Sequence, residues 1–333
     1  MKEALFYEKL DKDLVRCFLC SHFCRIKDGE FGFCGVRQNI SGILFILSYG
    51  RIVAAHVDPV EKKPLYHFLP GSSTFSIAAA GCNFRCGFCQ NWQISQEPEK
   101  NTQAKEATPD EIVEAALANK CRSISYTYTE PTIFFEYAFD IAKLAKARGL
   151  RNIFVTNGYM GEEPLKMISP YLDAANVDLK FFKEASYRKI CNAGLNPVLD
   201  SIKLMHGLGI WVEITTLVIP GENDSNEELK AIAGFIAGID KDIPWHVSGF
   251  HPDYKFSDHS PTPEPTLKKA RQIGEDAGLN FIYAGNVSGF GSDTYCPGCK
   301  KMLLKRDIFS ILDSNIKEGK CSFCGKAVPG IFK

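Results

Sequence analysis

Residues 74–89 read TFSIAAAGCNFRCGFC, a short apolar segment followed by three closely spaced cysteines. Thr74 to Ala80 has the length and composition of a buried strand. Cys82, Cys86 and Cys89 follow it directly, with three and then two residues between them. An iron–sulfur cubane normally takes four thiolates, so three ligands would leave one iron open to a substrate or cofactor. The stretch therefore predicts an open 4Fe–4S site at the end of a strand.

Further along the chain, short β-branched or apolar segments alternate with helical patterns, which predicts βα units around a parallel sheet. Together with the first strand, the expected strands are residues 74–80, 123–127, 152–156, 176–179, 211–219, 245–250 and 280–284. Six or seven units are too few for an eight-fold barrel, so we expect an open, partial barrel. In that architecture the chemistry gathers at the C-terminal ends of the strands.

Two helix starts can be recognised from local sequence. Residues 108–111 read TPDE, a capping box with proline at the first helical position. Ser225 followed by Glu228 repeats the box. Both segments therefore predict helices that connect the expected strands.

The composition is that of a soluble globular protein, because 45% of the 333 residues are hydrophobic and 23% are charged. Thirty-nine basic residues balance 39 acidic ones, which argues against a nucleic-acid-binding protein with a strongly basic surface. The chain has no apolar run of about 18 residues or more, and its N-terminus lacks the apolar core of a signal peptide. We therefore expect a cytoplasmic protein without a membrane partner.

Thirteen cysteines are many for such a chain. Without a signal peptide, reduced thiolates that hold metal are a better interpretation than disulfides. Eleven of them fall into three groups: Cys17, Cys20, Cys24 and Cys34; Cys82, Cys86 and Cys89; and Cys296, Cys299, Cys321 and Cys324. The remaining two, Cys121 and Cys191, are expected to be thiols packed as small buried hydrophobes.

The last group forms two Cys-x-x-Cys knuckles at the spacing of a zinc ribbon, Cys296–Cys299 and Cys321–Cys324. Four thiolates make a closed tetrahedral site. We therefore expect structural zinc that folds a small C-terminal module with little core of its own. An auxiliary iron–sulfur cluster or a rubredoxin-like iron is the alternative.

The first group also offers four thiolates, from Cys17, Cys20, Cys24 and Cys34, but at uneven spacing. Its first three members are as typical of an iron–sulfur loop as of a zinc knuckle, so the pattern leaves both zinc and a second cluster open. His22 lies within the group and could replace one thiolate, although a bystander role is the simpler interpretation.

The cysteine groups and the βα alternation divide the chain into three segments. Residues 1–70 form an N-terminal Cys-rich extension, in which the apolar stretch from Ile43 to Val57 is expected to form a hairpin. Residues 71–291 form the partial barrel. Residues 292–333 form the C-terminal zinc-ribbon-like module.

The central cysteines resemble the defining Cys-x-x-x-Cys-x-x-Cys loop of the radical SAM superfamily, including an aromatic residue, Phe88, before the last cysteine. The resemblance extends over residues 70–290. Within the superfamily, the chain resembles the pyruvate formate-lyase activating enzyme branch, and more narrowly the radical SAM member of the AmmeMemoRadiSam system. Four stretches carry this resemblance: DPVEKKPL at 58–65, residues 81–96, YTYTEPT at 126–132 and VTNGY at 155–159.

The resemblance implies an α/β fold, a partial (βα)6-type radical SAM barrel, and with it a reaction. The open iron of the 4Fe–4S cluster would bind S-adenosylmethionine, and one electron would cleave it to methionine and a 5′-deoxyadenosyl radical. That radical would remove a hydrogen atom from a substrate that the sequence does not identify. An electron donor such as flavodoxin or ferredoxin is implied as a partner.

The resemblance also implies cofactor-binding residues at the expected strand ends. Glu130 aligns with the acid of the family's Gly-Gly-Glu element, whereas Tyr128 and Thr129 stand at the two glycine positions. Val155 stands where the activating enzymes have an Asp that helps to hold a monovalent cation. The remaining implied residues are Phe88, Thr156, Asn157, Asp178, Lys180 and His251.

Each of these positions also has an ordinary structural interpretation. Glu130 can cap a loop, and Thr156 to Gly158 can be a turn in which glycine supplies positive φ. Asp178 and Lys180 can be a solvated pair, and His251 precedes a proline in a polar loop.

Several functions remain in competition. A radical SAM enzyme of the AmmeMemoRadiSam type would act with the two other proteins of that system, whereas a glycyl-radical enzyme activating enzyme would act on a protein loop. A non-enzymatic iron–sulfur electron carrier is disfavoured because the central site lacks a fourth ligand. A nucleic-acid-binding zinc protein is disfavoured by the zero net charge.

Overall fold

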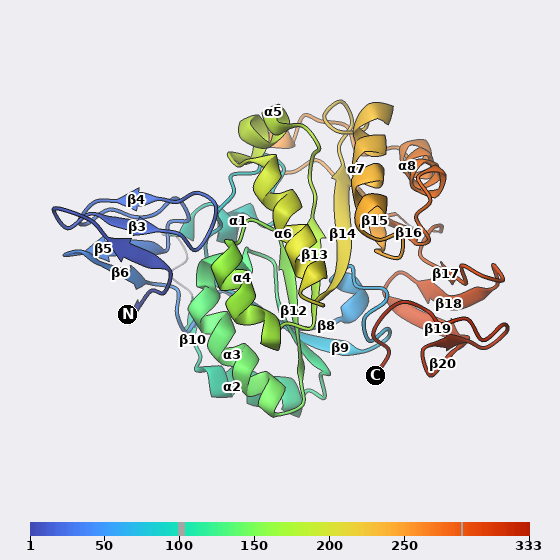
Figure 1. The fold of residues 1–333 in the computed structure, drawn as a ribbon, viewed down its shortest axis with the longest axis horizontal. Coiled ribbons are helices and arrows are strands. Elements are labelled where there is room, and N and C mark those ends of the chain that lie inside the picture. Colours follow the sequence, from blue (N-terminus) through green and yellow to red (C-terminus); the bar gives the residue numbers. More distant parts are fainter. Residues whose placement is uncertain (99–103, 288) are drawn as a thin grey trace.

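A single eight-stranded sheet forms the centre of the computed structural model, which describes residues 1–98, 104–287 and 289–333. The small N-terminal strands lie beyond one side of this sheet and the small C-terminal strands beyond the other, shown in blue and red in Figure 1. The main helices lie between these two groups of strands (Figure 1).

The central sheet has the strand order β16-β15-β14-β13-β12-β11-β9-β8. Its strands are β8 (Ala54–Pro59), β9 (Ser73–Ala78), β11 (Ser123–Tyr126), β12 (Arg151–Thr156), β13 (Ala174–Asp178), β14 (Trp211–Val218), β15 (Trp245–Gly249) and β16 (Ile282–Gly285). Neighbours from β9 to β16 pair in parallel, and β8 pairs antiparallel with β9. All seven expected strands are confirmed, and β8 and β16 are the edges of an open, partial barrel.

Helices connect the successive parallel strands. They are α1 (Trp92–Ser95), α2 (Pro109–Ala118), α3 (Phe135–Ala147), α4 (Glu162–Ile168), α5 (Glu184–Ser186), α6 (Leu195–Gly207), α7 (Asn226–Ile239) and α8 (Glu264–Asp276). Short 3-10 turns are η1 (Val60–Lys62), η3 (Pro131–Phe134), η4 (Ser169–Tyr171) and η6 (Tyr254–Phe256), and η5 (Tyr187–Cys191) is a π-helix. This alternation confirms the α/β class.

The two predicted capping boxes differ in the structure. At α2, Thr108 accepts a hydrogen bond from the Glu111 backbone and the Glu111 side chain accepts one from the Thr108 backbone, so this box is complete. At α7, Ser225 accepts from the Glu228 backbone. The Glu228 carboxylate instead accepts from the Phe182 backbone at 2.5 Å, so only half of the second box forms.

The central strands bury side chains on both faces. All four residues of β11 and all five of β15 are buried, as expected for parallel strands that face helices on one side and the barrel interior on the other. Ile232 and Ile236 of α7 are fully buried in the same core, and each contributes about 1.5–3 kcal/mol of hydrophobic stabilisation.

The N-terminal extension contains two three-stranded sheets and one strand of a two-stranded sheet, whose second strand lies outside the extension. They consist of β1 (Lys2–Glu3), β6 (Ile43–Ile46) and β5 (Arg37–Ile40); β2 (Tyr7–Lys9), β3 (Val15–Cys17) and β4 (Arg25–Ile26); and β7 (Arg51–Ile52) with β10 (Lys105–Glu106). The hairpin expected from Ile43 to Val57 is wrong. Instead β5 and β6 form a hairpin across Ser41 and Gly42, whose φ values of 51° and 75° suit a two-residue turn between twisted strands.

The C-terminal segment is a set of short antiparallel strands. These are β17 (Thr294–Tyr295), β18 (Met302–Asp307), β19 (Ser310–Ser314), β20 (Ile316–Lys317) and β21 (Lys320–Cys321). His67 connects this segment to the barrel, because its ring contacts the Pro329 carbonyl at 2.7 Å and the Tyr283 hydroxyl at 2.6 Å. In the part of the chain that the structure describes, no helix has the length and apolar character needed to cross a membrane.

Candidate active site

A cavity of about 530 Å³ lies at the C-terminal ends of the parallel strands, a size in the range of small-molecule sites. The loops after β9, β11, β12 and β13 supply most of its wall. The predicted residues among those that line it are Cys82, Cys86, Phe88, Cys89, Glu130, Thr156, Asn157, Asp178 and Lys180. The structure therefore brings together side chains from four successive strand ends.

His251 does not join this cavity. Its side chain is exposed, and the residues that line the cavity do not include it. The preceding Phe250 is fully buried and takes the inward position at this strand end, where the Thr262 hydroxyl accepts a hydrogen bond from its backbone at 2.8 Å. Tertiary packing around Phe250 thus leaves the histidine outside.

The cysteine loop is fastened to the π-helix η5. The Arg85 backbone donates to the Cys191 carbonyl at 2.9 Å, and the Gly87 backbone donates to the Ile190 carbonyl at 3.2 Å. Within the loop, the Phe84 backbone donates to the Cys82 sulfur at 3.3 Å. These contacts hold the three thiols at the cavity wall.

The three thiols suit a multi-iron group better than a single ion. Cys82, Cys86 and Cys89 are not all within 4.8 Å of one another, whereas thiolates that share one zinc ion lie about 3.8 Å apart. No other cysteine occurs among the described residues that line the cavity. The donor set therefore fits a 4Fe–4S cluster with one open iron.

Without metal, the thiols would be largely protonated. Burial raises the pKa of Cys82 and of Cys89. For Cys86 a hydrogen bond with Cys191, followed by burial, raises the pKa. A coordinated metal reverses this preference because it stabilises the thiolate directly.

Cys191 is a neighbour of the site that the sequence did not identify. It is fully buried, as expected for a packed thiol, but its sulfur lies 3.5 Å from that of Cys86. Its position follows from η5, a π-helix, and such irregular turns are frequent at functional sites. No local sequence signal places this residue beside a cysteine 105 positions away.

Glu130 lies at the cavity wall and forms four hydrogen bonds. It accepts from the Thr132 backbone at 3.0 Å, the Thr132 hydroxyl at 2.6 Å, the Thr156 hydroxyl at 2.7 Å and the Asn157 backbone at 2.8 Å. Burial raises the pKa of Glu130, and these hydrogen bonds oppose that rise. Glu130 therefore clamps the loops after β11 and β12 together.

Tyr128 adopts a backbone conformation that is unusual for a residue other than glycine. Its φ of 65° lies in the left-handed region that favours glycine. The Asn91 side chain donates to the Tyr128 carbonyl at 2.9 Å and holds this turn. The loop thus keeps a glycine-like path without glycine.

Asn157 connects the clamp to the cysteine loop. Its amide donates to the Asn83 side chain at 2.8 Å and lies 3.9 Å from the Cys82 sulfur. Its own side-chain oxygen accepts from the Tyr159 backbone at 3.1 Å. Asn157 therefore positions Asn83 and Cys82 relative to Glu130.

Asp178 and Lys180 form an ion pair of 2.8 Å at the cavity wall. The Lys180 side chain is mostly buried and its ammonium lies 5.6 Å from the centre of the Phe88 ring. Burial alone would lower the pKa of Lys180, but the charges of Asp178 and of the neighbouring thiol groups raise it overall. The pair thus places a persistent cation beside the cysteine loop.

A second charged cluster, formed by Asp58, Lys62, Lys63 and Tyr128, was not assigned a role from sequence. Lys63 lies 2.7 Å and Lys62 2.9 Å from the Asp58 carboxylate, which also accepts a hydrogen bond from the Tyr128 hydroxyl. Burial would raise the pKa of Asp58, but these donors lower it overall. Both lysines line the cavity because β8 pairs with β9, a pairing that local sequence does not reveal.

The C-terminal cysteines form a closed site. The sulfurs of Cys296, Cys299, Cys321 and Cys324 all lie within 4.8 Å of one another, and the pairs Cys296–Cys324 and Cys299–Cys321 are each separated by 3.7 Å. This spacing fits a tetrahedral site for one metal ion.

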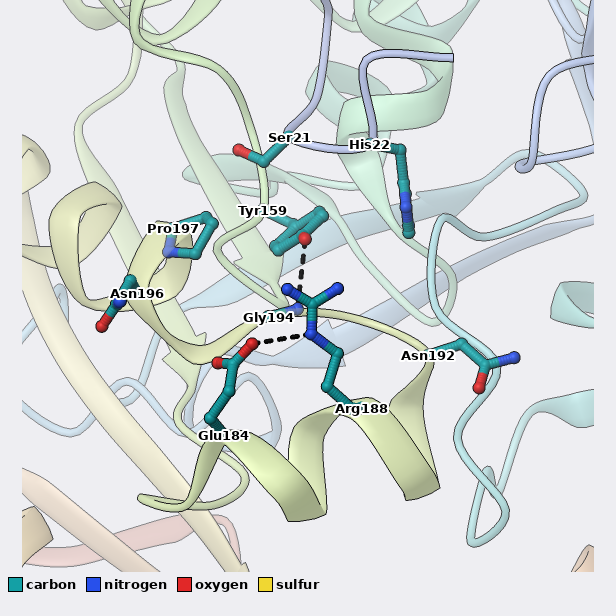
Figure 2. A pocket seen from close by; sticks show the side chains of 9 residues that line it. All are labelled: Ser21, His22, Tyr159, Glu184, Arg188, Asn192, Gly194, Asn196 and Pro197. Carbon is teal, nitrogen blue, oxygen red and sulfur yellow. Dashed lines mark hydrogen bonds and ion pairs between the residues drawn. The ribbon is translucent and has the colours of Figure 1, made fainter. Parts of the chain in front are cut away.

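A smaller cavity of about 260 Å³ lies where the N-terminal extension meets residues 184–197 (Figure 2). Its two charged residues, Glu184 and Arg188, pair at 2.7 Å. The Tyr159 hydroxyl accepts from the Gly194 backbone at 3.1 Å. Because these groups are engaged with one another, we place the active site in the larger cavity.

Comparison with known proteins agrees with this geometry. The family description "Radical SAM superfamily" matches residues 76–235. An uncharacterised protein of Methanocaldococcus jannaschii is 46% identical over 332 residues, which cover 98% of this chain and 99% of that protein. The pyruvate formate-lyase-activating enzyme of Clostridium pasteurianum is 27% identical over 209 residues, which cover 57% of this chain and 84% of that enzyme.

A solved structure also shares the fold. A radical SAM methyltransferase from Sphaerobacter thermophilus aligns with a TM-score of 0.51 and 15% identity, over 71% of each chain. At that identity the likeness concerns the fold alone.

Proposed function

This chain belongs to the radical SAM superfamily, in its pyruvate formate-lyase activating enzyme-like branch, and on that basis we propose a reaction of the AmmeMemoRadiSam type. In it, one electron supplied through a cluster that Cys82, Cys86 and Cys89 would hold would cleave S-adenosylmethionine to methionine and a 5′-deoxyadenosyl radical, and this radical would take a hydrogen atom from a substrate handled with the two other proteins of that system. The observation that carries the cofactor chemistry of this proposal is the three-thiol wall of the cavity, without a fourth cysteine among the described lining residues.

Each part of the cavity would have a defined task. Cys82, Cys86 and Cys89 would hold the 4Fe–4S cluster, which supplies the one-electron cleavage of the cofactor when both are bound. Glu130 would orient the methionine ammonium, as a positioning residue already held by Thr156 and Asn157. A pre-held carboxylate loses little entropy when the cofactor binds.

The remaining residues would shape the other side of the cofactor. Lys180, kept charged by Asp178, would attract the methionine carboxylate or another anionic group. Phe88 is 4% exposed and packs against Phe181 and Phe256, with ring centres 6.0 Å and 5.9 Å away. It would exclude water from the radical chemistry.

Structural zinc is proposed for Cys296, Cys299, Cys321 and Cys324. The 3.7 Å sulfur separations support one ion with four ligands. A one-electron donor of the flavodoxin or ferredoxin type and a cytoplasmic location belong to the same proposal.

A glycyl-radical enzyme activating enzyme is the second candidate. It is favoured by the relatives with such names, among them the C. pasteurianum enzyme and a putatively assigned activating enzyme of M. jannaschii that is 27% identical over 225 residues. In such an enzyme the 5′-deoxyadenosyl radical would take a hydrogen atom from a glycine in a protein loop. The two candidates share the cofactor chemistry and differ in the macromolecule that enters the cavity.

The test begins with anaerobic reconstitution of the full chain. The reduced protein should give a paramagnetic cluster signal that changes when S-adenosylmethionine is added, and 5′-deoxyadenosine should accumulate. Cys82→Ala, Cys86→Ala and Cys89→Ala should each lose both properties, whereas Cys121→Ala, a buried cysteine outside the site, should retain them. Full cofactor cleavage by any of the three variants would refute the assignment, and a signal without any cleavage would favour an electron carrier.

A further inference from the structure

We propose that Cys17, Cys20, Cys24 and Cys34 bind a second 4Fe–4S cluster, and that zinc is not their ligand. All four residues line one cavity at the base of the N-terminal extension. Cys17 ends strand β3, and the other three lie in the loops that follow. This cavity and the active-site cavity have no lining residue in common.

The spacing of the sulfur atoms distinguishes the two kinds of metal site. Among the described residues, only the C-terminal group brings three or more metal-ligand atoms within 4.8 Å of one another. No three of the four N-terminal sulfurs meet that condition, and neither do the three at the active site. Zinc bonds of about 2.3 Å require sulfurs roughly 3.8 Å apart, whereas in a cubane each thiolate binds its own iron and the thiolates stand further apart.

The chain therefore contains one cysteine group to compare with a single-ion site and another to compare with a cluster site. The C-terminal cysteines have the spacing of a single-ion site. Neither the N-terminal cysteines nor the triplet Cys82, Cys86 and Cys89 form such a close group. The N-terminal group has four cysteines where the triplet has three, and four thiolates complete the ligand set of a cubane.

The surroundings of the N-terminal cysteines also resemble those of the active-site triplet. Apolar side chains of Leu19, Ile26, Phe33 and Ile133 line the cavity. The Phe33 backbone N–H donates to the Cys24 sulfur at 3.5 Å. In the active site, the Phe84 backbone N–H donates to the Cys82 sulfur in the same way, at 3.3 Å. Backbone donors to ligand sulfurs and an apolar shell are two of the means by which proteins tune iron–sulfur clusters.

Arg37 supplies a buried positive charge at this cavity. Its side chain is 2% exposed, lines the cavity and pairs with Glu136 at 2.5 Å. The Arg37 Nε atom has no hydrogen-bond partner among the described residues. Although Glu136 balances the charge of this guanidinium, its spare Nε donor remains for a hydrogen bond to the negatively charged cubane that four thiolates would hold.

His22 does not compete as a ligand through its Nε2 atom. That atom lies 2.6 Å from the Asn83 carbonyl oxygen and must donate to it, because a carbonyl only accepts. The ligand set that we propose is the four cysteines, which all line this cavity.

The two cysteine groups are adjacent but use separate ligands. A Cβ atom at Gly81 would lie 2.9 Å from the Cys34 carbonyl oxygen, and the Arg85 side chain donates to the Phe33 carbonyl. The N-terminal site can therefore be examined in a chain whose active-site cysteines have been removed. The outcome does not depend on the proposed reaction.

The experiment uses the full chain with Cys82, Cys86 and Cys89 all changed to Ala, reconstituted anaerobically with iron and sulfide. We expect about four iron and four sulfide per chain, with a reduced paramagnetic signal that S-adenosylmethionine does not alter. The wild-type chain should contain about eight iron, and each form should also contain about one zinc.

The reciprocal variant, Cys20→Ala with Cys24→Ala, should lose about half of the iron and keep the signal that responds to S-adenosylmethionine. The measurement on the triple variant decides the question even if this reciprocal variant fails to fold. Two zinc ions and no iron in the triple variant would overturn the proposal, as would a wild-type iron content of about four.

Discussion

The sulfur atoms of Cys86 and Cys191 lie 3.5 Å apart, although 105 positions separate the residues in the chain. Cys191 is fully buried at the end of the π-helix η5, whose carbonyls hold the cysteine loop. When Cys86 binds iron as a thiolate, the Cys191 thiol becomes the donor of the pair. A donor to a ligand sulfur stabilises the reduced, more negative cluster.

Cys191→Ala should therefore lower the reduction potential of the active-site cluster without removing it. A neutral hydrogen bond contributes about 0.5–1.5 kcal/mol, which corresponds to tens of millivolts for one electron. The measurement is a redox titration monitored by electron paramagnetic resonance, with Cys121→Ala as the control. Loss of the cluster in Cys191→Ala would show instead that this residue is a ligand.

Glu130→Gln should weaken S-adenosylmethionine binding by about one to two orders of magnitude, because a charge-assisted hydrogen bond contributes roughly 1.5–3 kcal/mol. The glutamine side chain would also put an NH2 group in place of one carboxylate oxygen that accepts a hydrogen bond from Thr156 or Asn157. Cluster content should be unchanged, since Glu130 is not a ligand, and some cleavage should survive at saturating cofactor.

Equilibrium binding measures this affinity, and Glu163→Gln provides the matched control because Glu163 is exposed. If affinity is unchanged and only a pH-dependent step is lost, Glu130 takes part in substrate chemistry and does not orient the cofactor.

Cys321→Ala should unfold the C-terminal module selectively. With the proposed zinc, metal binding and folding would be one equilibrium, because the segment's own core is small, formed by Cys296, Leu303, Cys321 and Val328. We expect residues 292–333 to become sensitive to protease while the active-site cluster persists. Ser310→Ala, at an exposed position of β19, should leave the protease pattern unchanged. Iron in place of zinc at these four ligands would contradict the assignment.

His67 should make the stability of the protein depend on pH. Burial lowers the pKa of His67 to about 4. The neutral ring donates from Nδ1 to the Pro329 carbonyl and accepts at Nε2 from the Tyr283 hydroxyl. The unfolded chain, with a histidine pKa of about 6.5, takes up a proton first as the pH falls, so stability is lost between about pH 6.5 and pH 4.

The expected loss is about 1.4 kcal/mol per pH unit and about 3 kcal/mol in total. Denaturant unfolding between about pH 7 and pH 4 measures it, and His67→Gln should show a correspondingly shallower dependence. His206→Gln is the control, because His206 lies on the surface with a side chain 39% exposed. Equal slopes in His67→Gln and the wild type would contradict the prediction.

The sequence by itself determined the elements that local patterns encode. All seven parallel strands appear where short segments rich in apolar or β-branched residues predicted them, because a strand buried on both faces is rich in such residues. The capping box at Thr108 is complete because its two partners are three residues apart. The spacing of Cys82, Cys86 and Cys89 likewise lies within one loop, so the family signal could be read without the fold.

Only the tertiary structure decided which distant groups meet. It brought Cys191 to Cys86 and Lys63, paired with Asp58, to the cavity wall, and it left His251 in solvent. It also replaced the expected hairpin with the β5–β6 hairpin. It showed further that the C-terminal four-cysteine group is closely spaced, whereas the N-terminal group is not. Such distances depend on how strands and loops remote in sequence pack together, and no local pattern of residues specifies that packing.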